Sequence, residues 1–115
     1  MATIKDITGD YPVLKMHGCG NDFIVLYDCD ERLTREQAAA LCRLHFGVGA
    51  DGLIAVVRSR VKDAPFRMKF FNPDGTLAEM CGNGIRCFAK YLVDQRLVAR
   101  GGVVPVDTDA GLLVP

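Results

Sequence analysis

Residues 81–87 carry the most distinctive chemistry in this 115-residue chain. They place Cys81 immediately before a segment that is apolar at most positions, as in a buried helix. The start of a helix presents unpaired backbone N–H groups and the positive end of the helix dipole, which both favour a thiolate over a thiol. We therefore predict that Cys81 acts as a base or nucleophile. Gly82 and Asn83 would supply a backbone N–H group and an amide side chain to hold a small anionic substrate.

Two further asparagines are candidates for the same site. Asn21 lies in the polar segment 17–22, and Asn72 begins the turn 72–75. Each follows or precedes an expected strand, at a place where a scaffold usually presents functional groups. Ordinary turn chemistry explains either residue alone, since asparagine readily bonds its own backbone. Only their combination with a helix-terminal cysteine makes a substrate site worth proposing.

The elements that must position these residues can be read from the hydrophobic pattern. Thr34 and Gln37 form a capping box that opens one helix, and a second, almost wholly apolar helix is expected over 83–95. Strands are expected over 11–15, 23–27, 52–57, 66–71 and 103–106. The strands follow one another without regular helical crossovers, which excludes a doubly wound fold. The prediction is one α+β domain, residues 1–115, with a mostly antiparallel curved sheet wrapped around the helix 83–95 and one further helix outside.

Composition excludes several classes of partner. Lysine plus arginine (14) balances aspartate plus glutamate (14), and no basic run is present, which argues against nucleic acid or an anionic membrane surface. No signal peptide and no apolar stretch of membrane-spanning length is found, so a cytoplasmic protein is expected.

Two interpretations of sequence motifs, a zinc site and a dinucleotide site, are also excluded. The five cysteines are an odd number without zinc-ligand spacing, so free thiols and no metal are expected. Residues 47–52 match a glycine-rich nucleotide motif in letters. There, however, an expected helix precedes the segment and an expected strand follows it, which is the reverse of the order in a dinucleotide site. A glycine-rich turn is the better interpretation.

Four segments together resemble a known family, the diaminopimelate epimerases, in order and spacing. These segments are residues 15–23, 46–52, 71–75 and 80–87. The resemblance covers nearly the whole chain, but only the N-terminal half of the family's pattern. It implies an epimerase without pyridoxal, metal or any other cofactor. The implied reaction interconverts LL- and meso-diaminopimelate in the synthesis of lysine and cell-wall precursors.

The resemblance also implies roles for individual residues. Cys81 matches one of two cysteines that work on opposite faces of the substrate α-carbon, one taking a proton and the other returning one. The matched substrate contacts are Asn21, Asn72, Gly82 and Asn83. Gly52 departs from family members that carry glutamine there as a contact, and we leave it out of the site.

The second half of the family's site has no counterpart in this sequence. Cys87 cannot replace the opposing cysteine, because six residues along a helix turn it roughly 240° away from Cys81. The apolar segment 111–115 is an unusual ending for a finished domain, and in the family a later strand completes this domain. We expect the chain to need the C-terminal half of the enzyme as its partner and to be inactive alone, with a homodimer left open.

Three alternatives remain open. One is another pyridoxal-independent racemase, such as a proline-racemase-like enzyme, although that group typically has histidine where this chain has Asn83. A second is a non-catalytic half-domain that assembles with a separate partner chain. The third is a redox-sensing thiol pair formed by Cys81 and Cys87.

Overall fold

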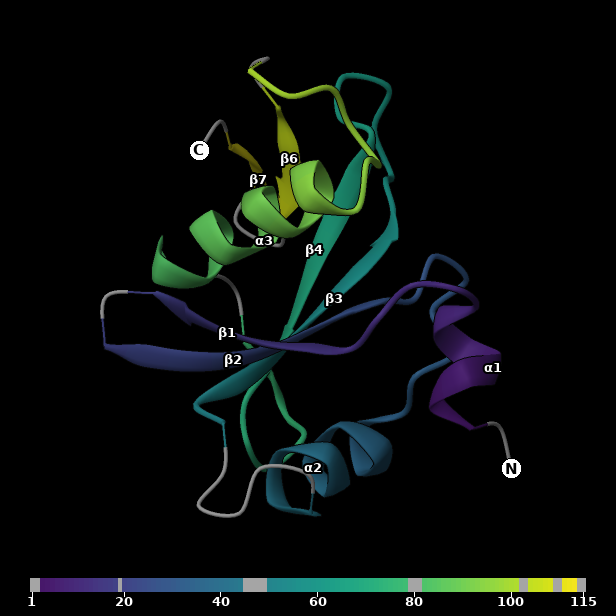
Figure 1. The fold of residues 1–115 in the computed structure, drawn as a ribbon, viewed down its shortest axis with the longest axis vertical. Helices are drawn as coiled ribbons and strands as arrows, with labels where there is room; N and C mark the ends of the chain where they lie inside the picture. Colours follow the sequence, from purple (N-terminus) through teal and green to yellow (C-terminus); the bar gives the residue numbers. More distant parts are fainter. Residues whose placement is uncertain are drawn as a thin grey trace.

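The computed structural model describes residues 3–18, 20–44, 50–78, 82–101, 104–108 and 111–113. These residues form one seven-stranded mixed sheet and three helices (Figure 1). The strands are β1 (Leu14–Gly18), β2 (Asn21–Tyr27), β3 (Gly52–Arg58), β4 (Phe66–Phe71), β5 (Leu77–Ala78), β6 (Val106–Thr108) and β7 (Gly111–Leu113). The helices are α1 (Ile4–Thr8), α2 (Arg35–Leu44) and α3 (Gly82–Asp94).

The sheet has the order β1-β2-β3-β4-β6-β7, and β5 pairs with β4 beside this path. The pairs β1–β2, β3–β4, β4–β5 and β6–β7 are antiparallel, whereas β2–β3 and β4–β6 are parallel. The predicted α+β class is therefore confirmed, with a sheet that is mixed but mostly antiparallel.

Alternate residues of the central strands face two different layers of helix. Ile54 and Val56 of β3 pack in the cluster formed by α3, whereas Leu53, Ala55 and Val57 pack with α1 and α2. All five side chains are fully buried, which explains why β3 reads as a continuous apolar run. The expectation of a single helix outside the α3 layer is wrong, because α1 shares the outer face with α2 (Figure 1).

Helix α3 is positioned by an apolar stripe that spans most of its length. Ile85, Phe88, Tyr91 and Leu92 follow one another at helical spacing and are buried against the sheet. The Tyr91 hydroxyl donates a hydrogen bond to the Pro12 carbonyl at 2.9 Å. Burial raises the pKa of Tyr91, so its hydroxyl stays protonated and can act as a donor. These contacts fix where the start of α3 lies relative to β1 and β2.

The C-terminal end of α3 is capped by a residue with a strained backbone conformation. The Leu97 N–H bonds the Leu92 carbonyl and the Arg96 N–H bonds the Val93 carbonyl, which together form a Schellman cap. Arg96 occupies the left-handed position of this cap, at φ 59°, where glycine is usual.

Replacing Arg96 with glycine should therefore raise the free energy of unfolding by about 1 kcal/mol. The matched control is Gln95→Gly, one residue earlier, whose φ is not positive. This change should lower the stability by a similar amount. Urea unfolding of both variants tests the prediction, and a loss of stability in Arg96→Gly would contradict it.

The start of α2 confirms the predicted capping box. The Gln37 N–H donates to the Thr34 hydroxyl at 3.1 Å, and the Thr34 N–H donates to the Gln37 side-chain oxygen at 2.9 Å. Gly75, in the turn after β4, lies against this helix start. A Cβ atom built on Gly75 would collide with the Arg35 carbonyl oxygen, and the Gly75 backbone has φ +90°.

Several predicted boundaries were wrong. The first strand covers Leu14–Gly18 rather than 11–15, and the strand expected over 103–106 is found at Val106–Thr108. The expected six-residue turn at 17–22 is shorter, because β1 and β2 pair as far as Gly18 and Asn21. The helix opened by Thr34 and Gln37 is expected to end at Gly47, but residues 45–49 lie outside the described residues.

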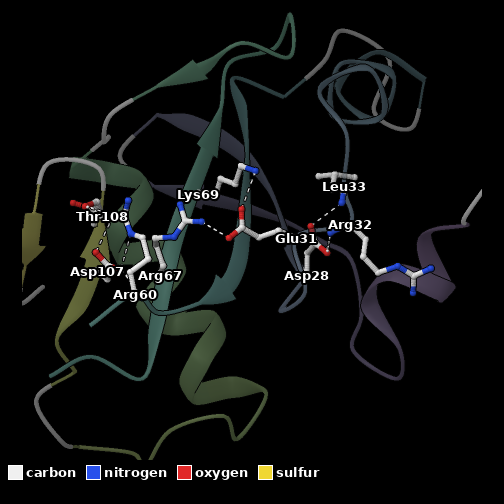
Figure 2. A network of polar contacts seen from close by, with 9 residues as sticks. All are labelled: Asp28, Glu31, Arg32, Leu33, Arg60, Arg67, Lys69, Asp107 and Thr108. Carbon is white, nitrogen blue, oxygen red and sulfur yellow. Dashed lines mark hydrogen bonds and ion pairs between the residues drawn. The ribbon is translucent and has the colours of Figure 1, made fainter. Parts of the chain in front are cut away.

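A network of polar contacts links β4 to the segment between β2 and α2 (Figure 2). Glu31 accepts a hydrogen bond from Arg67 and lies 3.2 Å from the Lys69 ammonium nitrogen. Burial of the Glu31 carboxyl raises its pKa, but these two bonds outweigh that effect and the pKa lies below its ordinary value. Arg67 alternates with apolar residues in the sequence, yet it is only 7% exposed. The ion pair with Glu31 therefore accompanies the burial of this charged side chain.

A bidentate ion pair holds β6 in this network (Figure 2). Asp107 accepts bonds from Arg60 Nε and Nη2, each at 3.1 Å, and from the Arg60 backbone N–H at 3.0 Å. The side chain of Asp107 is 6% exposed and that of Arg60 is 54% exposed. The bonds from Arg60 hold the pKa of Asp107 below its ordinary value. The ionised form of Asp107 is therefore stabilised by folding.

Replacing Asp107 with asparagine should lower the free energy of unfolding by about 2 kcal/mol at pH 7, less than for a fully buried pair because Arg60 is half exposed. Since the folded pKa lies below the unfolded value of about 3.9, the carboxylate's contribution is complete above about pH 5 and is lost as the pH falls through the folded pKa. The difference between variant and parent should shrink over that range. Urea unfolding at pH 7, 5 and 3 measures it, and a difference independent of pH would refute the prediction.

The control for this experiment is Asp30→Asn. Asp30 pairs with Arg58 at 3.2 Å, but both side chains are more than 70% exposed. An exposed pair of this kind contributes little. The control should therefore change the stability by well under 1 kcal/mol at every pH.

Candidate active site

The candidate residues converge on one end of the sheet because of the strand directions. β2 and β3 run parallel and both begin there, whereas β4 runs antiparallel to β3 and ends there. Asn21 is the first residue of β2, and Asn72 directly follows β4. Helix α3 begins over the same end, next to the turn between β1 and β2 (Figure 1). We call this region the site end of the sheet.

Asn21 and Asn83 are in direct contact at the site end. Asn83 Nδ2 donates a hydrogen bond to Asn21 Oδ1 at 2.9 Å, in a partly buried position. This bond uses one donor of Asn83 and one acceptor site of Asn21, whereas each amide has two N–H donors and two acceptor lone pairs. The pair therefore keeps both donors and acceptors for a ligand without adding net charge. We refer to these two residues as the amide pair.

Asn72 lies at the same end but bonds within its own turn. Its Nδ2 donates to the Thr76 hydroxyl at 3.0 Å, and its backbone N–H donates to the Thr76 carbonyl at 2.7 Å. Thr76 in turn donates to the Asp74 carboxylate, whose pKa is lowered by this bond. The turn is thus as predicted, and a substrate contact from Asn72 stays a prediction.

Gly82 is the first residue of α3, and it is exposed. Apart from its chain neighbours and the backbone of α3, no atom of the described residues lies within 4 Å of a Cβ built on Gly82, so a ligand can approach this backbone closely. Cys81 precedes it directly and lies outside the described residues, as does Cys19. Cys87 is buried on the sheet-facing side of α3, among the apolar residues of that layer. The described part of the site therefore consists of the amide pair and the open start of α3.

The structure supplies a reason for glycine at position 52. A Cβ atom there would lie 2.7 Å from Cζ of Phe70 and 2.9 Å from the carbonyl oxygen of Phe71. A glutamine at this position would require the Phe70 ring to move. The exclusion of Gly52 from the side-chain contacts therefore has a steric basis in the packing of β3 against β4.

A charged cluster beside the amide pair was not predicted from the sequence. Asp22 accepts a hydrogen bond from His17 Nδ1 and lies 3.5 Å from the Lys15 ammonium nitrogen. The bond from His17 holds the pKa of Asp22 below its ordinary value. The Asp22 backbone N–H donates to Asp51 Oδ2 at 2.7 Å. Asp51 precedes Gly52 in the glycine-rich segment 47–52. Its place in that segment was the sequence feature that could have indicated a role for Asp51.

The described residues contain neither a metal centre nor a membrane span. No group of three or more histidine, cysteine, aspartate or glutamate side chains in this part of the chain is arranged to hold a metal ion. None of the helices described is both long enough and apolar enough to cross a membrane.

Comparison with known proteins gives a consistent family match. The family model described as diaminopimelate epimerase matches residues 13–115. The diaminopimelate epimerase of Caldanaerobacter subterraneus subsp. tengcongensis is 48% identical over 101 residues, covering 88% of this chain and 36% of that protein. The one of Halothermothrix orenii is 50% identical over 107 residues, with the same coverage. The chain thus spans about a third of the length of these curated relatives.

Solved structures with a similar fold come from other named groups. A PhzF-family phenazine biosynthesis protein of Bacillus anthracis has a TM-score of 0.63 and 25% identity, covering 90% of this chain and 33% of that chain. A probable proline racemase of Agrobacterium radiobacter K84 has a TM-score of 0.66 and 20% identity, covering 89% and 36%. The second likeness establishes the fold alone.

Proposed function

Because the chain belongs to the diaminopimelate epimerase family, a family of isomerases, we propose that it supplies one half of the active site of an enzyme that epimerises diaminopimelate. The observation that supports this best is the amide pair at the start of α3, where Asn83 lies two residues beyond the predicted catalytic cysteine. The pair brings two of the four predicted substrate contacts together from positions 62 residues apart.

In the proposed reaction, the Cys81 thiolate removes the α-proton from one face of the substrate. A protonated cysteine from the C-terminal half then donates a proton to the opposite face, which inverts the centre and interconverts the LL and meso isomers. The negative charge that develops on the substrate carboxylate would be stabilised by the Gly82 backbone N–H and the dipole of α3. Asn21, Asn72 and Asn83 would orient the amino-acid group through hydrogen bonds. No cofactor or metal takes part in this scheme.

We also propose a partner, a sheet shape and a cellular role for the chain. Its partner is the C-terminal half of the enzyme, which carries the opposing cysteine, and the chain alone is inactive. The sheet curves around α3 as a half-barrel. The activity serves lysine and cell-wall precursor synthesis in the cytoplasm. The family resemblance and the coverage of about a third of the relatives support these proposals.

The proposal is tested by exchange of the substrate α-proton with deuterium from the solvent. LL-diaminopimelate is incubated in D₂O with the purified chain, with the C-terminal two-thirds of the Caldanaerobacter relative, or with both. Exchange and meso product are expected only with both chains, because each supplies one cysteine. Exchange by this chain alone would refute the half-site, and absence of exchange in a stable complex of the two chains would refute the epimerase assignment.

The proline-racemase-like alternative predicts a different outcome in the same assay. The solved structures in that group share the fold. The chain carries Asn83 where that group typically has histidine, and its family match is to the epimerases. The combined chains should therefore exchange the α-proton of diaminopimelate and not that of proline.

A further inference from the structure

Asp51 lies next to the amide pair but has no place in the proposed reaction. Its Oδ2 accepts a hydrogen bond from the Asp22 backbone N–H at 2.7 Å, and its own N–H donates to the Asp22 carbonyl at 2.7 Å. The parallel ladder of β2 and β3 starts one residue later, at Phe23 and Gly52. Asp51 therefore extends this ladder to the beginning of β2, with its side chain as one of the two links.

The first of these bonds acts directly on Asn21. The Asp22 N–H belongs to the peptide plane that joins Asn21 to Asp22, so a carboxylate bonded to it restricts rotation about the Cα–C bond of Asn21. Hydrogen bonds to a charged acceptor are shorter and stronger than neutral ones. The direction in which the Asn21 side chain leaves the backbone is thus set jointly by Asp51 and by the pairing of Asn21 with Gly18 of β1. That direction determines whether its Oδ1 meets Asn83.

Asp51 is itself held in place by its neighbours. The next residue, Gly52, packs so closely against Phe70 and Phe71 that a Cβ atom there would require them to shift, and this packing holds the start of β3 in place. The Asp22 carboxylate would repel Asp51, but it is bonded by His17 and faces the Lys15 ammonium group. These two partners compensate the like charge.

We propose that Asp51 is a positioning residue for the amide pair: through the Asp22 peptide N–H it sets the geometry in which Asn21 meets Asn83. Its importance for catalysis rests on the proposed function, because only there does the amide pair bind substrate. The effect on geometry does not depend on that function. It can be measured in this chain without substrate or a second half.

The test uses nuclear magnetic resonance on the 115-residue chain and its variants. Asp51→Ala removes the acceptor, Asp51→Asn keeps a carbonyl oxygen in the same place, and Asp63→Ala removes an exposed carboxylate elsewhere as the control. In Asp51→Ala, the Asp22 amide should exchange with solvent about tenfold faster. The side-chain amide resonances of Asn83 should move towards those of a solvated amide. In Asp51→Asn and Asp63→Ala, both signals should stay close to the parent.

Exchange at the Val56 amide in the centre of β3 separates a local effect from a general loss of stability. A change at Asp22 and Asn83 with Val56 unchanged supports the proposal. Unmoved Asn83 resonances in Asp51→Ala, or equal shifts in the alanine and asparagine variants, would overturn it. Neither result bears on the epimerase assignment, which is tested by proton exchange alone.

Discussion

Replacing Cys81 with alanine should lower the kcat/KM of the combined epimerase chains by about 10³-fold, because a positioned acid or base contributes roughly 10²–10⁴-fold to proton transfer. Cys81→Ser should lose nearly as much, since a hydroxyl is a far weaker acid than a thiol and is not ionised at the start of a helix. Neither change should prevent assembly of the two chains. The measurement is α-proton exchange from LL-diaminopimelate, with complex formation followed by size-exclusion chromatography.

The matched control for this prediction is Cys87→Ala. Cys87 is 4% exposed and packs in the apolar layer beneath α3, so its removal should cost about 1 kcal/mol of stability and leave the exchange rate near that of the parent. A redox pair of Cys81 and Cys87 predicts instead that both variants abolish a peroxide-induced linkage without affecting catalysis. Retained exchange in Cys81→Ala would remove the basis of the proposed mechanism.

Replacing Gly75 with alanine should lower the free energy of unfolding by about 3 kcal/mol. About 1 kcal/mol comes from placing a Cβ in the left-handed region at φ +90°. About 2 kcal/mol comes from the collision with the Arg35 carbonyl oxygen, a backbone atom at the start of α2 that cannot rotate away. Because Gly75 separates β4 from β5, the clash would push the turn carrying Asn72 away from α2. Urea unfolding followed by circular dichroism measures the change.

Gly101→Ala isolates the conformational part of this effect. Gly101 also has a positive φ, at +81°, but a Cβ atom added to it would have no atom of the described residues within 4 Å apart from its chain neighbours. Its substitution should therefore cost only about 1 kcal/mol. Equal losses in the two variants would show that the contact with α2 contributes nothing.

The helix after Cys81 and the buried strands were predictable because the apolar residues of each element follow the pattern typical of that element. Helix α3 starts at Gly82, one residue from the predicted start, since Ile85, Phe88, Tyr91 and Leu92 can be buried together only on a helix. β3 was predicted over 52–57 from its short apolar run, and every residue in that range is buried in the structure. The capping box of α2 was likewise fixed by two side chains three residues apart.

Helix α1 was missed because its five residues are too few to show a helical period, although its capping box between Thr3 and Asp6 is local. Its Ile7 is buried against residues distant in the sequence. The other missed features depend on contacts that the local sequence does not encode. β1 extends through His17 because backbone pairing with Asp22 needs no apolar side chain. The ion pair of Arg67 with Glu31 was not predicted, because it joins residues 36 positions apart.

The candidate site was predictable in part for the same reasons. Asn21 and Asn83 were selected from turn and helix-start positions, and the fold brings them together. Asp51 was overlooked because its role depends on the parallel alignment of β2 with β3, which separate segments of sequence do not reveal. The role of Asn72 as a substrate contact remains a prediction, as does the role of Cys81.

The 62 residues that separate Asn21 from Asn83 have a consequence for how the protein folds. Contacts between such distant segments form after the entropy of closing the intervening loop has been overcome, so they tend to appear late. During synthesis on the ribosome, substrate-binding competence would emerge only after α3 has docked on a sheet that is already paired. In the proposed enzyme, binding of diaminopimelate would then be confined to molecules that have finished folding, and half-folded chains would not sequester it.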